Sequence, residues 1–507
     1  MFGLMIRSWL IGEQLGDADY ELLPDTLTSM TTSVPHRPFW GIPVLSSPLL
    51  LWAAFILAHL WLGILNLFGP GLPFGDVTIV YRFWTDQALV SNYWVGIDGS
   101  WVYPIVALVP MLLARVFGPE LFPNTWLSLV LVLDLVAFGV LTGWGRFRRN
   151  TGVAWWWVAF LLLLGPIALG RIDSITVPLA IVGVLLIATR PRAAAVVLTV
   201  ATWIKVWPAT LLAAILISVR ARMQVVVGAV ITSVAIIAVA LSFGAGANVF
   251  SFVTQQSVRG LQVEAPISTI WLWQEFAGAA NTFVYYDRGF LTWQVRGPGV
   301  EVASVLMNPL MILVVLALTL LSLLAVRNRV PVQDLLPALS LAYVAAVIAF
   351  NKVGSPQYVT WLAVPIILGL ATNAVGRGRP FRTPAIIVLV VAGLTQLIYP
   401  YLYGYLLGLN PVMLMVISVR NLLYFVLLGW AVATLWRASR ARYSTFPPDD
   451  RISEGWLPAV WPFGVERVLP EDRDRPEDSD RPDDSDRPED SDRPNDCDRL
   501  DKDELAC

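Results

Sequence analysis

Acidic, basic and aromatic side chains are interleaved in the segment between the first two long apolar stretches, residues 69–101. The candidates for chemistry in this segment are Asp76, Arg82 and Asp98, and several Trp and Tyr residues separate them. A carboxylate within hydrogen-bond reach of a hydroxyl can act as a general base, and aromatic rings stack on the apolar faces of sugars. The segment therefore favours a carbohydrate site. The alternative is an ordinary solvated loop whose aromatic residues lie at a membrane interface.

Further ionisable residues lie in short motifs at the ends of later apolar stretches. These candidate substrate-binding residues are Arg171 and Asp173 in GRIDS, Lys205 in WIKVWP, Arg259 in the long loop 244–299, and Lys352, Gln357 and Tyr358 in NKVGSPQY. Ionisable groups at membrane depth are costly and usually functional. The cations could hold a lipid-linked phosphate. For Lys205 the alternative is that it extends to the membrane interface without binding anything.

Other kinds of site have no signature in the chain. It shows no Cys/His cluster for zinc, no glycine-rich phosphate loop and no Ser/His/Asp set. The sequence thus implies no metal or cofactor and no nucleic-acid partner. Asp134 stands alone inside an apolar stretch, as does His59, and for Asp134 we expect a structural hydrogen bond to a neighbouring helix.

The elements that must position these residues are membrane-spanning helices. Of all residues 56% are apolar and 22 are Trp, which is far from the composition of soluble proteins. Stretches of apolar residues long enough for the hydrocarbon core predict an all-α, polytopic protein of about twelve transmembrane helices. We expect the following spans: 49–68, 126–142, 153–169, 176–189, 193–205, 209–219, 225–243, 302–326, 335–350, 359–371, 383–399 and 412–436. The short, Pro-containing stretch 103–117 is expected not to cross.

The connections between these stretches alternate between two kinds. One kind is short and rich in Arg, as in GRFRRN (145–150) and GRGRPFR (376–382), whereas the other carries the polar motifs described above. Short Lys- and Arg-rich connections remain cytoplasmic. The alternation predicts a plasma-membrane protein with both termini in the cytoplasm and the polar motifs together on the extracytoplasmic side.

The two ends of the chain lie outside the predicted membrane domain, 49–440. Residues 1–48 form a cytoplasmic N-terminal segment in this scheme. The segment Tyr443–Cys507 holds 21 acidic and 9 basic residues, a net charge of 9 − 21 = −12, and it includes four copies of a DRPEDS-like repeat. Such a composition cannot bury a core. We therefore expect residues 441–507 to be a disordered acidic tail.

Several of the motifs occur together, in the same order, in a known family. GDVTIVYRFW, VGIDGSWVYPIVALVP, GRIDSITVPLAI, KVWPATLL, SVRGLQVE and NKVGSPQYVTWL make the chain resemble the family 87 glycosyltransferases, formerly DUF2029, which have the membrane-embedded C-type fold. The group includes actinobacterial mannosyltransferases that use polyprenyl-phosphate-mannose. The resemblance implies an inverting transferase that moves a hexose from a polyprenyl-phosphate donor to a glycolipid or glycan acceptor in the cell envelope.

The resemblance also assigns roles to residues. Position in the segment does not decide between Asp76, Asp86 and Asp98 as the base, and the match to GDV…Y selects Asp76. Tyr103, with Pro104, matches the aromatic-Pro start of the next helix. Some relatives place a His near the site in a later loop; neither His36 nor His59 is placed for this, so Lys352 or Arg259 would contact the phosphate. The alternative function is a polytopic transporter or lipid-sugar flippase, which would have its polar groups at the midplane and repeated halves.

Overall fold

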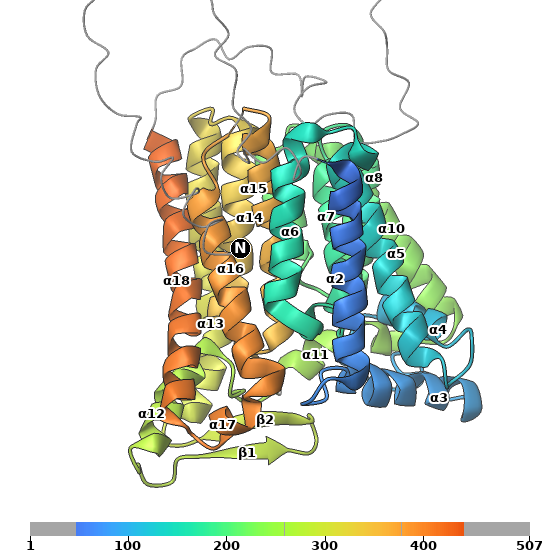
Figure 1. Cartoon of the computed structure of the whole chain (residues 1–507), viewed down its shortest axis with the longest axis vertical. Coiled ribbons are helices and arrows are strands. Elements are labelled where there is room, and N and C mark those ends of the chain that lie inside the picture. Colours follow the sequence, from blue (N-terminus) through green and yellow to red (C-terminus); the bar gives the residue numbers. More distant parts are fainter. Residues whose placement is uncertain (1–46, 258, 377, 441–507) are drawn as a thin grey trace, which may run out of the picture. The chain divides into compact units, whose positions relative to one another are not determined.

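Long apolar helices that run back and forth between two ends dominate the fold (Figure 1). The computed structural model describes residues 47–257, 259–376 and 378–440. Within these residues, nine helices are long and apolar enough to cross a membrane. The protein is accordingly a mostly helical, multi-pass membrane protein. The predicted cytoplasmic segment 1–48, except its last two residues, and the predicted tail 441–507 lie outside the described residues.

The helices agree with the predicted spans. The long ones are α2 (Pro48–Phe68), α5 (Phe122–Thr142), α6 (Thr151–Leu164) extended by turns to the span Arg148–Ala168, α10 (Arg222–Ser242), α13 (Val300–Arg327), α14 (Val332–Ala349), α15 (Ala363–Ala374) preceded by the 3₁₀ turn Pro356–Leu362, α16 (Arg382–Gln396) extended by a turn to Tyr401, and α18 (Pro411–Arg440). Three shorter helices, α7 (Asp173–Leu186), α8 (Pro191–Ile204) and α9 (Ala209–Ser218), coincide with the other predicted spans. That all twelve of these helices cross the membrane stays a prediction.

The remaining elements are short and lie in the connections. They are α3 (Arg82–Val90), α4 (Leu108–Ala114), α11 (Ser251–Ser257), α12 (Thr269–Phe276), α17 (Tyr403–Leu407) and the strands β1 (Phe283–Asp287) and β2 (Thr292–Arg296). The segment 103–117 contains helix α4 and its leading turn, and that it does not cross the membrane stays a prediction. The antiparallel pair β1–β2, with Tyr285 opposite Gln294, is the departure from the predicted all-α fold.

Local sequence explains where many helices begin. Pro occupies the first or second position of α2, α5 and α8, where its missing N–H would lack a partner in any case and its fixed φ suits a helix. The apolar runs that follow have few polar interruptions. Their burial differs: windows in α10 and α13 are 11% and 17% buried, whereas that in α14 is 78% buried. Because both α10 and α13 expose apolar side chains, they suit the lipid boundary, whereas α14 lies in the packed interior against α9 and α18.

The arginine-rich connections gather at one end of the helices, here called the arginine end. Gly145 lies against Pro48 at the start of α2, and Gly378 lies against the Gln333 carbonyl at the start of α14. The Asn328 amide, after α13, hydrogen-bonds the Ser439 carbonyl at the end of α18. The connections with the polar motifs are at the opposite end, here called the site end, where Figure 1 places α3, α11, α12, α17 and the β-hairpin.

Candidate functional site

Three short helices form the floor of the candidate site. Helices α7 and α8 have 14 residues each and α9 has 10, so they extend about 21 Å and 15 Å at 1.5 Å per residue. A hydrocarbon core is about 30 Å thick. All three adjoin arginine-rich connections, so their other ends stop short of the site end. Asp173, at the start of α7, and Lys205, directly after α8, therefore lie recessed between longer helices.

Lys205 is held on this floor by a carboxylate and three aromatic rings. Its Nζ is 2.7 Å from Asp173 Oδ2, and it lies 5.3–5.8 Å from the ring centres of Tyr103, Tyr358 and Trp361. Trp361 Nε1 donates a 2.6 Å hydrogen bond to the other oxygen of Asp173. The ion pair with Asp173 stabilises the charged ammonium, and cation–π contacts add to its stability.

Asp76 lies at the first turn of a short π-helical segment, Asp76–Tyr81, which continues into α3. Its Oδ2 is 3.0 Å from Arg171 Nε, and the side chain of Asp76 is 40% exposed whereas that of Arg171 is 8% exposed. Among the described residues, the other carboxylate oxygen makes no hydrogen bond. Asp76 therefore combines a fixed orientation with an oxygen that is open to a ligand, and π-helical turns often occur at functional sites.

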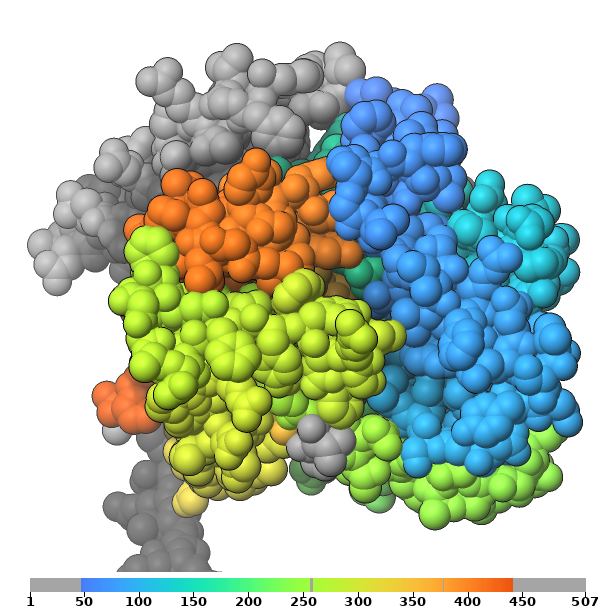
Figure 2. Space-filling model, turned by 90° about the horizontal axis from the view of Figure 1, so that it is seen from below, coloured from blue at the N-terminus to red at the C-terminus, as the bar shows by residue number. Residues whose placement is uncertain are grey.

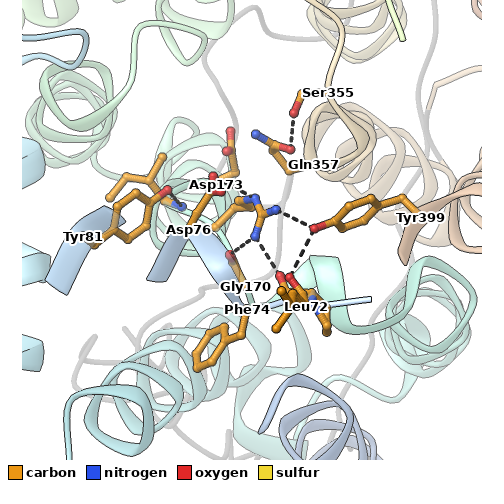
Figure 3. Close-up of polar contacts among 12 residues, drawn as sticks. Leu72, Phe74, Asp76, Tyr81, Gly170, Asp173, Ser355, Gln357 and Tyr399 are labelled. Carbon is orange, nitrogen blue, oxygen red and sulfur yellow. Dashed lines mark hydrogen bonds and ion pairs between the residues drawn. The ribbon is translucent and has the colours of Figure 1, made fainter. Parts of the chain in front are cut away.

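Arg171 uses most of its donors within the protein (Figure 3). Its Nη1 donates to the carbonyls of Pro73, at 2.7 Å, and Gly170, at 2.8 Å, and its Nη2 donates to the Tyr399 hydroxyl at 3.0 Å. Burial would lower its pKa, but Asp76 and Tyr399 raise it above the usual value. A guanidinium has five N–H donors, and four contacts occupy Nε, Nη1 and part of Nη2. Arg171 thus anchors the Asp76 carboxylate and has little capacity left for a phosphate.

Aromatic rings connect the Asp76 turn with the Lys205 floor. The Tyr81 ring packs edge-on to Tyr103 and stacks near Trp84, and Trp101 lies edge-on to both Trp84 and Tyr103. The Tyr81 hydroxyl accepts a 3.2 Å hydrogen bond from the Ile172 backbone N–H. Burial raises the pKa of Tyr81 well above its usual value, so this hydroxyl is neutral. The rings form one wall of the recess.

The NKVGSPQY motif forms the opposite wall. Tyr358 stacks on Trp361 at 4.2 Å, the Ser355 hydroxyl donates to Gln357 Oε1, and Lys352 is 4% exposed. Burial lowers the pKa of Lys352. Gly354 allows a close approach here, because a Cβ at this position would lie 2.0 Å from the Ala265 backbone nitrogen. The motif is therefore pressed against the segment 259–265, hereafter the strap.

The strap brings Arg259 to the same wall. The Arg259 guanidinium is 5.8 Å from the Phe290 ring centre and close enough to the Tyr358 hydroxyl to interact with it electrostatically. Its Nε is buried and has no hydrogen-bond partner. Arg259 therefore has an unused donor on Nε, and the Lys205 ammonium gives one of its three donors to Asp173 and has others for a ligand.

Two predicted site residues lie apart from this cluster. Arg82 forms ion pairs with two other carboxylates: its Nε lies 3.8 Å from Asp86 Oδ2, and its Nη2 lies 3.6 Å from Glu120 Oε1. Asp98 is exposed and accepts a 2.7 Å hydrogen bond from the Trp94 backbone N–H within its own turn. Neither contact connects these residues to Asp76, Arg171 or Lys205.

Figure 2 shows the site end from outside. The segment around β1 and β2 and the segment that contains α3 occupy two sides of this face, and the surface dips where they meet. The strap and the Asp76 turn belong to these two sides.

Inside the helices, isolated polar residues pair with each other. His59 Nε2 lies 2.9 Å from Asp134 Oδ2, so the expected helix–helix hydrogen bond of Asp134 joins α5 to α2. Arg420, within α18, is 2.7 Å from Glu264 Oε2 and 3.0 Å from the Glu264 carbonyl. The sequence interpretation missed Arg420, although a single Arg inside an apolar helix is a recognisable signal. It also missed Trp361 and Tyr399, for which no signal distinguishes them from interfacial aromatics.

The site contains no ready metal centre, and its relationship to known proteins rests on the motifs alone. The described residues include no group of three or more His, Cys, Asp or Glu side chains that could hold a metal ion. No protein-family model, curated protein or solved structure matches the chain. Membership of the family 87 glycosyltransferases and the C-type fold therefore remain predictions.

Proposed function

We propose that this protein is an inverting glycosyltransferase with the membrane-embedded C-type fold. It transfers a hexose, mannose by the resemblance to family 87, from a polyprenyl phosphate to a hydroxyl of a glycolipid or glycan. The observation that carries the proposal is the pairing of a half-exposed, oriented carboxylate, Asp76, with a recessed cation, Lys205, through one aromatic wall. A general base and a phosphate-binding cation are the two groups that such a transfer needs.

Each group has a defined part in this reaction. The acceptor hydroxyl attacks the anomeric carbon of the donor while Asp76 takes its proton, and the bond from that carbon to the phosphate oxygen breaks. The departing lipid phosphate gains negative charge, which Lys205 and Arg259 stabilise. An ammonium has three donors, and Lys205 gives one to Asp173. Arg171 does not bind the phosphate in this scheme but keeps Asp76 oriented.

The position of the polar groups favours a transferase over the transporter or flippase alternative. Transporters place substrate groups near the midplane, between repeated halves. Here Asp76, Arg171 and the strap belong to connections at the site end, and only the ends of α7 and α8 are recessed. The tryptophan and tyrosine rings along the recess suit the apolar faces of a sugar.

We propose further that the protein lies in the bacterial plasma membrane with the site end extracytoplasmic and the arginine end cytoplasmic. The first and last described helices, α2 and α18, begin and end at the arginine end, so both termini would be cytoplasmic. Single cysteines in the connection 145–150 and in the loop 277–281 test this after Cys497 and Cys507 are replaced. Only the second should react with an impermeant maleimide in intact cells; the reverse pattern would overturn the orientation.

The activity is tested by transfer of labelled sugar. Purified protein is incubated with polyprenyl-phosphate-[¹⁴C]mannose and a lipid extract from a strain that lacks the gene, in which the unmodified acceptor accumulates. A labelled glycolipid or glycan that forms with the wild-type chain and not with Asp76→Asn supports the proposal. If the wild-type chain forms no labelled product from this donor, the proposed reaction is wrong.

A further inference from the structure

Buried side-chain N–H groups that lack a hydrogen-bond partner are confined to the site end. Within the part of the chain that the structure describes, they are Trp101 Nε1, Arg259 Nε and Gln262 Nε2. Buried donors in native proteins are nearly always satisfied, because leaving one unpaired costs free energy. Two of these three groups are on the strap, which indicates a ligand with oxygen acceptors at this segment.

Residues 262–264 of the strap are held by contacts to three other elements. The Gln262 N–H donates to the Lys352 carbonyl at 3.1 Å, and the Val263 N–H donates to the Trp293 carbonyl at 3.1 Å. Its far end is held by the buried pair of Glu264 and Arg420. The strap is thus fixed to the NKVGSPQY motif, to β2 and to α18 at once.

The amide of the neighbouring Gln294 bonds to other groups and not to Gln262. Gln294 lies opposite Gln262 on β2, but its Oε1 accepts from the Tyr285 hydroxyl at 3.0 Å and its Nε2 donates to Asp287 at 3.1 Å. Its amide also packs on Gly260, where a Cβ would lie 2.0 Å from Oε1. Gln262 itself is 4% exposed. A buried amide is therefore oriented by the fold yet left with a free donor.

We propose that the strap is a recognition element for the donor, in which Gln262 Nε2 and Arg259 Nε donate hydrogen bonds to oxygen atoms of a lipid-linked sugar phosphate. This inference rests on the proposed function, since it names the part of the donor site that reads the head group. The acceptor atoms are phosphate oxygens or sugar hydroxyls. Arg259 contributes charge beside Tyr358 and Lys205, whereas the neutral amide of Gln262 contributes direction.

The test compares Gln262→Leu with the wild-type full chain in detergent. Polyprenyl phosphate and polyprenyl-phosphate-mannose are the probes, and the thermal unfolding midpoint is measured as each is titrated. Leu removes the unpaired donor and replaces the amide by an apolar group of comparable bulk, so the ligand-free midpoint should stay or rise. The apparent Kd should weaken about threefold to tenfold, the value of one neutral hydrogen bond. Gln224→Leu, at an exposed position of the arginine end, is the matched control and should change neither quantity.

The two probes identify the oxygen that Gln262 binds. Weaker binding of both lipids assigns a phosphate oxygen, and weaker binding of the mannosylated lipid alone assigns a sugar hydroxyl. A lowered ligand-free midpoint with unchanged Kd for both lipids would overturn the inference and make Gln262 structural. A wild-type chain that binds these lipids but transfers no sugar would refute the proposed function while the comparison still decides the role of the strap; binding of neither lipid would refute both.

Discussion

Replacing Asp76 by Asn should separate catalysis from folding. The amide keeps the size of the carboxylate. Its oxygen can still accept a hydrogen bond from Arg171 Nε, which lies 3.0 Å from the Asp76 carboxylate in the wild-type chain. Arg171 keeps its contacts to Pro73, Gly170 and Tyr399, so the turn around the site should be preserved. What Asp76→Asn loses is the ability to take a proton from the acceptor.

The expected loss is in turnover. General-base catalysis contributes about a hundredfold to ten-thousandfold, so kcat for sugar transfer should fall by this factor. The donor KM should change little, because the phosphate is bound by Lys205 and Arg259 in the proposed scheme. The assay is transfer of labelled mannose from polyprenyl phosphate by purified protein, with the thermal midpoint as a check on folding.

Two other carboxylates of the same segment are matched controls. Asp86 pairs with Arg115 at 3.1 Å, away from Arg171, and Asp98 is exposed and bonded within its own turn. Asp86→Asn and Asp98→Asn should both retain most activity. Full activity of Asp76→Asn together with an inactive Asp98→Asn would transfer the role of base to Asp98. Full activity of both would refute base catalysis by this segment.

Two further predictions concern the cations. Lys205→Met should weaken donor binding about tenfold to hundredfold, the value of charged hydrogen bonds. It should also lower the unfolding midpoint, because Asp173, 1% exposed, loses its ion pair. The double variant Lys205→Met/Asp173→Asn should recover the midpoint but not donor binding, and recovery of both would make the lysine structural. Burial lowers the pKa of Lys352. If its charge helps to bind the donor, the donor KM should therefore rise with pH at values below those at which an ordinary lysine loses its proton. Lys352→Arg should move this rise in KM to higher pH, and a KM–pH profile that is the same in the variant and the wild type would exclude this role.

The sequence predicted the helices well because their signal is local. Long apolar runs, Pro at helix starts and Arg in alternate connections are each read within some twenty residues. The same signals predicted that the polar motifs lie together, and the structure brings several of them into contact, as in the pairs Asp76–Arg171 and Asp173–Lys205. The β-hairpin was not predicted, since its strands of five residues lie in a long loop without an apolar run that stands out in so hydrophobic a chain.

The partners within the site could not be predicted, because they depend on contacts between distant segments. Arg171 meets Tyr399, 228 residues away, and Asp173 meets Trp361, 188 residues away. Composition identified Arg171 and Lys205 equally as cations for a phosphate. They differ in how many of their N–H groups already bind other groups of the protein, and this number follows only from the packed structure.

The GRIDS motif owes its importance to what lies on either side of Ile172. Arg171 fixes Asp76, whereas Asp173 fixes Lys205, and the Ile172 N–H between them is bonded to the Tyr81 hydroxyl. One turn of chain thereby sets the spacing between the proposed base and the proposed phosphate-binding cation. When catalytic groups are correctly spaced before the substrate binds, the activation free energy is much lower, since the groups need no reorganisation during the reaction. Ion pairs of this kind add little stability by themselves, so positioning of the two reacting groups is a reasonable role for both pairs.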